Sequence, residues 1–316
     1  MPVAGDAPME AEALRSAMKG FGTNEGTLIK VLAPADPLLM TRIRETYKRY
    51  FNRDLQQDII KETSGRFEDV LVALVRGPLQ NDVHNIRSAL KGAGTNETVL
   101  DDALLGRSNA DMHAIQREYQ RTFNRNLLDD VRGDLSFKTE VLYEMVLSAQ
   151  RDEESPHINP QLVDQDANQL HQAIKGKLDK TGNGNKQQSV CHIMTKRSDG
   201  HLRAVAHHYE RTYHKSLEEA IKKEFTGHME HALLHILRGA TDRAMRDAVL
   251  LEDCMRGLGT RDDLLVQRVV RVHWDRDHMR QVRGAYKHRY NKELATRIAK
   301  ETSGDYERAL VACVSV

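Results

Sequence analysis

Three short glycine-rich segments of the chain are each followed, about forty positions later, by an acidic residue. The segments read MKGFGTNE at 18–25, LKGAGTNE at 90–97 and MRGLGTRD at 255–262. Closely spaced glycines permit a backbone that turns several carbonyl oxygens toward one point. Calcium is a hard cation that takes six to eight oxygen ligands, and main-chain carbonyls suit it. Because carbonyls carry no formal charge, such a loop also needs a carboxylate, and the segments are therefore candidate calcium sites.

The acid follows the second glycine of its segment at a nearly constant offset. The offset is 40 residues for Glu62, 40 for Asp134 and 42 for Glu301. A lone Gly-x-Gly-Thr segment is more often a tight turn with a helix cap, but three copies with matched acids favour a metal site. A nucleotide-binding loop is disfavoured, because the glycines follow a helical pattern and no Gly-Lys-Ser/Thr comes after them.

A few carbonyls and one bidentate carboxylate leave a calcium ion short of ligands and still positively charged. The open positions can take water or oxygens of a lipid phosphate, so we expect the ion to bridge the protein to an acidic membrane. The residue between the glycines then points outward to the acyl boundary, and the basic residue before them pairs with neighbouring phosphates. The expected membrane-contacting residues are Phe21, Ala93 and Leu258 between the glycines, and Lys19, Lys91 and Arg256 before them.

The composition supplies no other source of attraction to an anionic surface. The 316 residues include 47 Lys and Arg against 46 Asp and Glu, with no block of like charge. This balance argues against a nucleic-acid partner and against a polybasic membrane anchor. No apolar run approaches the roughly 20 residues of a membrane span, and the N-terminus lacks a secretory signal. Three widely spaced cysteines favour a reducing, cytosolic setting. Cys254, beside a glycine-rich segment, is expected to be an ordinary buried thiol, with a redox role as the minor alternative.

The segment that carries the acid occurs four times. KETSGRFEDVLVALV at 61–75 recurs in related form at 133–147, 223–237 and 300–314. Together with the three glycine-rich segments, this gives four repeats of about 70 to 80 residues. Apolar residues at helical spacing, without alternating strand patterns, predict an all-α fold of about five short helices per repeat. The expected organisation is a short N-terminal tail at 1–9, repeats at 10–77, 81–150, 163–239 and 244–316, and a linker at 151–162.

Within the first repeat, the apolar face of one helix includes Leu38, Ile43 and Tyr47. Thr23 and its equivalents Thr95 and Thr260 are expected to be N-caps, because acidic residues follow in the next turn. The fifteen histidines show no ligand spacing and are expected on helix surfaces. Breaks between helices of the first repeat are expected at 20–24, 34–37, 52–54 and 63–65.

These features resemble the annexin family, whose hallmark is four repeats of about seventy residues with K-G-x-G-T-[DN]-E and a later acid. The match runs from about Glu10 to Val316. The resemblance implies a curved, all-helical disc whose convex face carries calcium loops and binds acidic phospholipids such as phosphatidylserine. The implied ligands are carbonyls of Met18, Gly20 and Gly22 with Glu62; of Leu90, Gly92 and Gly94 with Asp134; and of Met255, Gly257 and Gly259 with Glu301.

The third repeat departs from the family pattern. IKGKLDKTGNGNKQQSV at 174–190 stands in place of the glycine-rich motif, although Glu224 keeps the position of the acid. The segment from Asp179 imitates the opening of an EF-hand loop, but its twelfth position is Val190, which cannot supply the completing acid. We therefore expect calcium binding here to be much weaker than elsewhere or absent, with Glu224 mainly a cap or ion-pair partner. The weak ligands, if used, are Gly182, Gly184 and Glu224.

Two other classes of function are open. Stacked helical repeats often bind other proteins, so an interaction scaffold with calcium loops in a minor role is the main alternative. A hydrolase would need a nucleophile and base, or a metal held by side chains, and no recognisable set is present. We expect a non-enzymatic cytoplasmic protein that reaches the cytosolic face of membranes when calcium rises, with protein partners through the N-terminal tail as a further option. Asp82 and Arg107, which line a polar seam in similar proteins, are expected to form a structural ion pair.

Overall fold

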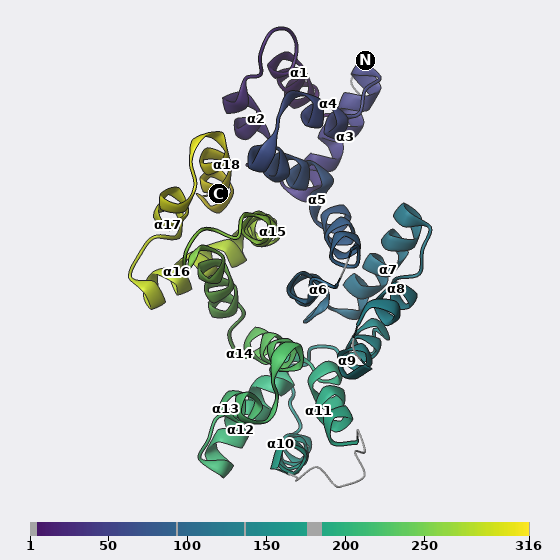
Figure 1. Cartoon of the computed structure of the whole chain (residues 1–316), viewed down its shortest axis with the longest axis vertical. Helices are drawn as coiled ribbons and strands as arrows, with labels where there is room; N and C mark the ends of the chain where they lie inside the picture. The colour runs from purple at the N-terminus through teal and green to yellow at the C-terminus, as the bar shows by residue number, and fades with distance from the viewer. Residues whose placement is uncertain (1–4, 93, 136, 176–184, 316) are drawn as a thin grey trace. The chain divides into compact units, whose positions relative to one another are not determined.

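The computed structural model describes residues 5–92, 94–135, 137–175 and 185–315, and these form eighteen α-helices and no strand (Figure 1). Two of the helical segments contain a kink, α5 (Gly65–Ala89) at Gly77 and α14 (Gly227–Met255) at Asp242. Counting each of these as two helices gives twenty, or five for each of four repeats. The predicted all-α fold of four repeats is confirmed.

The five helices of each repeat follow one another along the chain. The first repeat comprises α1 (Pro8–Ala17), α2 (Glu25–Leu32), α3 (Pro37–Phe51), α4 (Leu55–Glu62) and the first part of α5. The second comprises the rest of α5, α6 (Glu97–Leu104), α7 (Asn109–Phe123), α8 (Leu127–Asp134) and α9 (Phe137–Leu147). The third comprises α10 (Pro160–Lys175), α11 (Asn185–Lys196), α12 (Asp199–Tyr213), α13 (Leu217–Glu224) and the first part of α14. The fourth comprises the rest of α14, α15 (Asp262–His273), α16 (Arg276–Tyr290), α17 (Leu294–Glu301) and α18 (Gly304–Ser315).

Local sequence explains where the helices begin and end. Asp36 caps α3 by accepting a hydrogen bond from the Leu39 amide at 2.7 Å, and Pro37 occupies the first helical position, where no amide is needed. The helix ends at Asn52, which adopts a left-handed conformation that asparagine tolerates better than most residues. The third helix of every repeat ends in the same way, at Asn52, Asn124, His214 and Asn291.

The core of each repeat is built around a buried tyrosine of its third helix. Tyr47 and Ile43 are fully buried, as their spacing predicts. Leu38, predicted on the same apolar face, is instead 61% exposed, because it lies in the first turn of α3, beyond the core. The other core tyrosines are Tyr119, Tyr209 and Tyr286.

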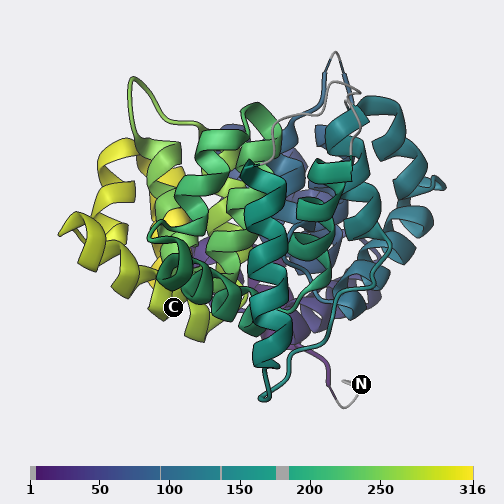
Figure 2. The same cartoon turned by 90° about the horizontal axis from the view of Figure 1, so that it is seen from below.

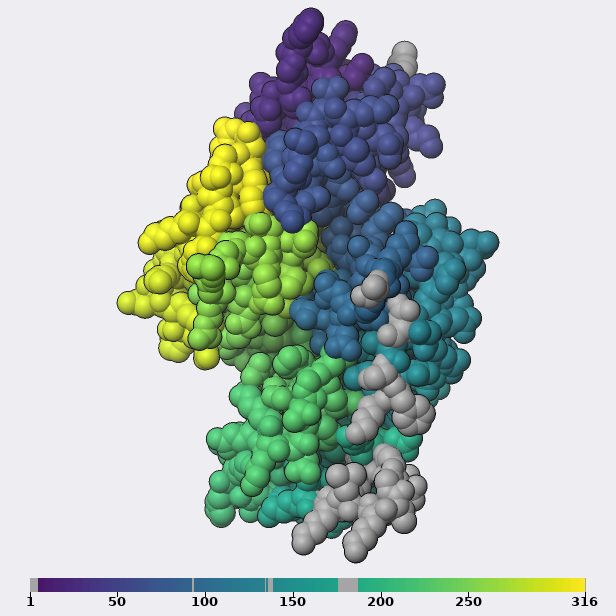
Figure 3. Space-filling view, viewed as in Figure 1, coloured from purple at the N-terminus to yellow at the C-terminus, as the bar shows by residue number. Residues whose placement is uncertain are grey.

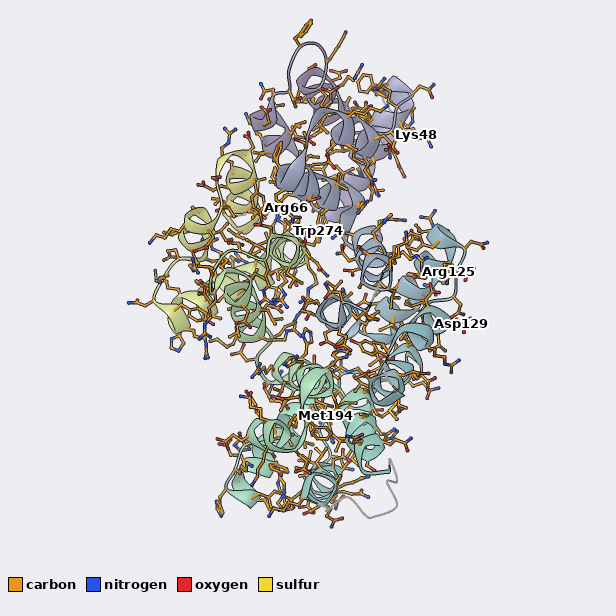
Figure 4. The ribbon with its side chains drawn as sticks, in the orientation of Figure 1. Lys48, Arg66, Arg125, Asp129, Met194 and Trp274 are labelled. Atoms are coloured by element: carbon orange, nitrogen blue, oxygen red, sulfur yellow. The ribbon has the colours of Figure 1, made fainter. Side chains whose placement is uncertain are left out.

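The helices belong to two compact units, residues 1–82 with 247–316, and residues 83–246. Seen from a second direction, long helices run side by side within each unit, with loops at their ends (Figure 2). In the first unit, α18 contacts both α2 and α15, so that helices of the first and fourth repeats pack together (Figure 3). Arg66 of α5 adds an ion pair to Asp263 of α15 in this region (Figure 4). In the second unit, α10 contacts α11 and α12, and α11 contacts α9.

The placement of the histidines differs from the prediction. His201 and His278 are buried, and each ring nitrogen Nε2 lies close to a buried carboxylate, 2.8 Å from Asp166 and 2.7 Å from Asp247. Arginines join both carboxylates, Arg197 from the turn between α11 and α12 and Arg271 from α15. These clusters form between helices that are distant in sequence, so the spacing of residues along one helix does not predict them.

The burial of a cysteine, one ion pair and the absence of a membrane span were also predicted. All three cysteines are buried. Asp82 and Arg107 fall in different units, so their ion pair stays a prediction. None of the described helices combines the length and the apolar character that crossing a bilayer requires.

Glu218 in the first turn of α13 should make stability depend on acid pH. Hydrogen bonds from Arg238 and Lys222 lower the pKa of Glu218 from 4.5 to about 2. A carboxyl whose pKa is lower in the folded state stabilises above its unfolded pKa, and this contribution is lost as pH falls from about 4.5 toward 2. Because these side chains are about one-third exposed, solvent screens the gain, and E218Q should cost about 1 kcal/mol at pH 7.

Urea unfolding at pH 7 and at pH 3 measures this effect. The difference between wild type and E218Q should shrink at the lower pH. The neighbouring variant E219Q is the control, because glutamine can also complete the capping box that Glu219 forms with Ser216. Equal losses for E218Q at both pH values would show that the ion pair is not the cause.

Candidate functional site

The glycine-rich segment of the first repeat forms a closed loop between α1 and α2. The Asn24 amide donates a hydrogen bond to the Ala17 carbonyl at 2.9 Å, which joins the two ends of the loop. Gly20 and Gly22 have φ angles of +110° and +81°, which residues with a side chain rarely adopt. Phe21 between them is fully exposed, at 112% of its reference surface. The sequence of the loop thus determines both its closure and its outward tip.

The same loop occurs in the second and fourth repeats. The closing hydrogen bonds run from the Asn96 amide to the Ala89 carbonyl and from the Arg261 amide to the Cys254 carbonyl, both at 2.9 Å. The paired glycines again have positive φ, and Leu258 at the fourth tip is 109% exposed. The equivalent tip residue of the second loop, Ala93, lies outside the described residues. The positive-φ glycines of these loops are Gly92, Gly94, Gly257 and Gly259.

Main-chain carbonyls of the first loop are available as ligands. Within the part of the chain that the structure describes, no donor forms a hydrogen bond with the carbonyl of Met18, Gly20 or Gly22. Unpaired carbonyl oxygens are uncommon in folded proteins, and a cation can satisfy them as well as water can. The side chain of Met18 is buried, so it anchors the start of the loop beneath the carbonyls.

The predicted acids occupy one structural position, the last residue of the fourth helix of each repeat. Glu62 ends α4, Asp134 ends α8, Glu224 ends α13 and Glu301 ends α17. The C-terminal end of a helix carries partial negative charge, which adds to the attraction of the carboxylate for a cation. The structure describes the backbone of Asp134 and not its side chain.

The threonine of the loop connects it to the acid. The Thr23 hydroxyl donates to the main-chain oxygen of Glu62 at 3.0 Å and lies 3.5 Å from its Oε2 atom. The Thr260 hydroxyl lies 3.2 Å from Oε2 of Glu301. The predicted N-cap role of the threonines is therefore wrong. The residue after each threonine takes the N-cap position instead, at Asn24, Asn96 and Arg261.

The loop and the acid together suit a hard divalent cation. The first loop offers neutral oxygens, and one exposed carboxylate lies beside it. Among the described residues, no basic side chain pairs with Glu62, so its charge is available to an ion. Lys19, Lys91 and Arg256 are exposed beside their loops, and their contacts with phosphate groups stay a prediction.

A buried polar cluster supports the acid in the first repeat. Asp58, one turn before Glu62, accepts hydrogen bonds from Tyr47 at 2.7 Å and from two nitrogens of Arg53 at 2.6 Å, and Arg15 lies 3.9 Å away. Burial alone would favour the protonated carboxyl, but the hydrogen bonds from Arg53 and Tyr47 lower the pKa of Asp58. Burial, together with the hydrogen bond to Asp58, raises the pKa of Tyr47 to about 12. The cluster fixes α1, α3 and α4 against one another.

The second repeat has the same cluster around Asp130. Its carboxylate accepts from Tyr119 at 2.7 Å and pairs with Arg87 at 3.1 Å and with Arg125, which is labelled in Figure 4. These residues were not among those predicted from the sequence. The signal that reveals them is an arginine three positions before the loop and an aspartate four positions before the acid, in both repeats.

The fourth repeat has a different arrangement at the same positions. Arg297 takes the place of the aspartate and Glu252 that of the arginine. The Arg297 guanidinium pairs with Oε1 of Glu301, donates to the Met255 carbonyl and lies 3.3 Å from Oε2 of Glu252. The hydrogen bond from Arg297 lowers the pKa of Glu301. Met255 and Glu301, both predicted as calcium ligands, therefore lie together here around a side-chain cation.

In the third repeat, a cavity lies beside the position of the cluster. Ala220 replaces the aspartate, and the cavity of about 270 Å³ is lined by residues that include Tyr209, Lys223 and Glu224. Glu224 is exposed, and none of the described residues forms a hydrogen bond or ion pair with it, so its role as a cap or ion-pair partner stays a prediction. The prediction for Gly182 and Gly184 concerns positions outside the described residues.

The family model for annexins matches residues 9–74, 81–143, 165–236 and 246–313. The chain belongs to the annexin family. It is 40% identical over 312 residues to annexin C1 of Cryptococcus neoformans var. grubii. The aligned region covers 98% of this chain and 65% of that protein. The chain thus spans just under two thirds of that annexin, and 62% of human annexin A7.

Solved annexin structures have the same fold. A mutant of annexin A8 with an intact N-terminus superposes with a TM-score of 0.89 at 32% identity, covering 97% of this chain and 94% of that one. Calcium-bound annexin (Sm)1 superposes with a TM-score of 0.86 at 27% identity, covering 100% of this chain and 92% of that one. Annexins are known as calcium-dependent phospholipid-binding proteins.

Replacing Gly22 by alanine should weaken calcium binding at the first loop. An added Cβ would meet no atom within 4 Å, so the cost is that of placing a side chain at φ +81°, about 1–2 kcal/mol. Because the loop is exposed, we expect it to relax and lose its carbonyl arrangement, with roughly tenfold weaker calcium binding. Calorimetric titration measures this in a chain whose other two complete loops carry D134N and E301Q.

The control is Gly26→Ala, four residues along and inside α2. Its added Cβ would meet Asn24 Oδ1 at an ordinary distance of 3.6 Å, and alanine favours a helix over glycine. Calcium binding should therefore be unchanged in G26A. Unchanged calcium binding in G22A as well would remove the glycine geometry from the account of this site.

Proposed function

We propose that this annexin docks on acidic phospholipid membranes through calcium ions held in the loops of the first, second and fourth repeats. The observation that carries the proposal is the arrangement of the first loop. Its main-chain carbonyls are unpaired, the carboxylate of Glu62 has no basic partner among the described residues, and Thr23 links the loop to Glu62. An ion held by these groups keeps open coordination positions and net positive charge. Oxygens of lipid phosphates can fill the open positions, and their negative charge balances that of the ion.

The exposed loop tips support a membrane as the partner. Phe21 and Leu258 project fully into solvent between their glycines, where a large apolar side chain has no protein contact to make. On a membrane they would enter the interface between headgroups and acyl chains, while Lys19 and Arg256 approach phosphates. The chain's own charges nearly balance, so calcium supplies the attraction that a basic surface would otherwise supply.

The cellular role follows from reversible docking. A protein that binds when calcium rises is suited to membrane trafficking, organisation or repair on the cytosolic face of membranes, without catalysis. A scaffold for protein partners is the second candidate, favoured by the exposed surfaces that repeat proteins offer. That function would not require calcium, so the two are separable by experiment.

Replacing the three acids together should abolish docking. The variant E62Q/D134N/E301Q keeps the size of each side chain and removes the formal charge of each loop site. In wild type, co-sedimentation with phosphatidylserine vesicles should require calcium, be reversed by a chelator and weaken with salt, because the bridge is ionic. The triple variant should stay in the supernatant while its circular dichroism is unchanged.

The matched control is a triple variant of acids outside the loops, E68Q/D111N/E230Q, which should dock normally. Vesicle binding of equal strength in calcium and in chelator would contradict the proposal and favour the scaffold. An unchanged calcium requirement in E62Q/D134N/E301Q would show that these acids are not ligands.

Serine at both apolar tips should weaken docking without changing the calcium-free protein. Burying a side chain such as Phe21 or Leu258 contributes about 1.5 kcal/mol or more, so each substitution should raise the dissociation constant from vesicles roughly tenfold. Leu38→Ser is the control, because Leu38 is also exposed but lies outside the loops. If L38S weakens docking as much as F21S/L258S, the tips have no special role at the membrane.

A further inference from the structure

The polar cluster behind the loop has reversed charges in the fourth repeat. In the first and second repeats, an arginine of the first helix faces an aspartate of the fourth helix, as Arg15 faces Asp58. In the fourth repeat, Glu252 faces Arg297. The third helix contributes a tyrosine in each case, and the Tyr286 hydroxyl accordingly donates to Glu252 where Tyr47 donates to Asp58.

The reversal brings a cation to the calcium loop. An aspartate four residues before the acid is held in the cluster by arginine, as Asp58 is by Arg53. Arginine at this position is longer and of opposite charge to Glu301, which lies one helical turn away, and the two form an ion pair within α17. The guanidinium reaches on to the Met255 carbonyl, the first oxygen of the loop.

The Arg297 guanidinium therefore contacts the two kinds of ligand that a calcium ion would use. It neutralises the carboxylate of Glu301 and satisfies a main-chain carbonyl, and its side chain is only 14% exposed. Thr260 holds the second oxygen of Glu301 at 3.2 Å, so both oxygens of the carboxylate are engaged. In the first repeat, by contrast, Glu62 has no basic partner among the described residues.

The geometry points to Arg297 as a built-in competitor for calcium. Its guanidinium occupies the ligand groups of the fourth loop until it withdraws toward Glu252 and Tyr286. This inference rests on the proposed function of the loops. Calcium at this loop must break the contacts of Arg297 with Glu301 and Met255, and the displaced cation stays nearby and repels it. Glu252 and Tyr286 give the guanidinium a place to stay, so the displacement is reversible. The fourth loop is consequently the last of the three complete loops to fill, at a higher calcium concentration than the first.

The experiment isolates the fourth loop in the full chain carrying E62Q and D134N. In this parent, R297Q removes the competing charge and should lower the calcium dissociation constant, measured by calorimetry, by about tenfold or more. The calcium concentration for half-maximal binding to phosphatidylserine vesicles should fall with it. Without calcium, R297Q should lower the melting temperature, because Glu301 and Glu252 lose their partner, and calcium should restore more stability to R297Q than to the parent.

Two further variants make the outcome decisive. K300Q removes an exposed positive charge from the same helix, next to Glu301, and should leave the calcium affinity nearly unchanged. E252Q/R297Q removes both members of the reversed pair, so Glu252 does not remain as an unpaired charge. It should show the same gain in calcium affinity as R297Q, and it serves as the test if R297Q alone does not fold. Equal or weaker calcium binding in R297Q and in E252Q/R297Q would overturn the inference and leave Arg297 as a structural brace.

The proposed function is tested separately by the wild-type chain in the same assays. If wild type binds neither calcium nor vesicles, the proposed function fails. If wild type docks and R297Q shows no gain in the isolated fourth loop, only the role of Arg297 fails.

Discussion

Each candidate site depends on bringing one carboxylate to a loop that lies about forty residues earlier in the chain. The loop supplies only neutral oxygens, so without that charge it would have little affinity for calcium. The acid ends the fourth helix of the repeat, and the loop follows the first, so the packing of these two helices decides whether a site exists. In the first repeat, Thr23 joins the two parts directly, and Asp58 with its tyrosine and arginines holds the helices behind them.

Four copies of one frame allow the sites to differ through the residues behind the loop. The aspartate of the first two repeats becomes Ala220 in the third and Arg297 in the fourth. Alanine leaves a cavity, whereas arginine brings a positive charge into contact with the candidate ligands. These positions are not ligands themselves, but they set the local charge that an arriving ion meets. If the loops bind calcium as proposed, such differences give a graded response to calcium without any change of fold.

The balanced net charge of the chain also bears on how it could bind a membrane. A chain with almost equal numbers of acidic and basic residues has no standing attraction to an anionic membrane. Under the proposed function, affinity concentrated in a few loops makes the attraction depend on reversible calcium binding. The exposed apolar tips at Phe21 and Leu258 add area that only a membrane or another partner can bury.

The sequence by itself determined the all-α fold, the four repeats, the breaks between helices, and the nearness of the first and fourth loops to Glu62 and Glu301. These are set by local rules: helical spacing of apolar residues, glycines that need positive φ, and a repeat that keeps its own register. Only the tertiary structure decided what surrounds each acid. The threonine contact to Glu62, the buried histidines and the position of Arg297 between Met255 and Glu301 depend on helices that are distant in sequence. A side chain's partners are chosen by packing in three dimensions, and the spacing of residues along one helix does not record that choice.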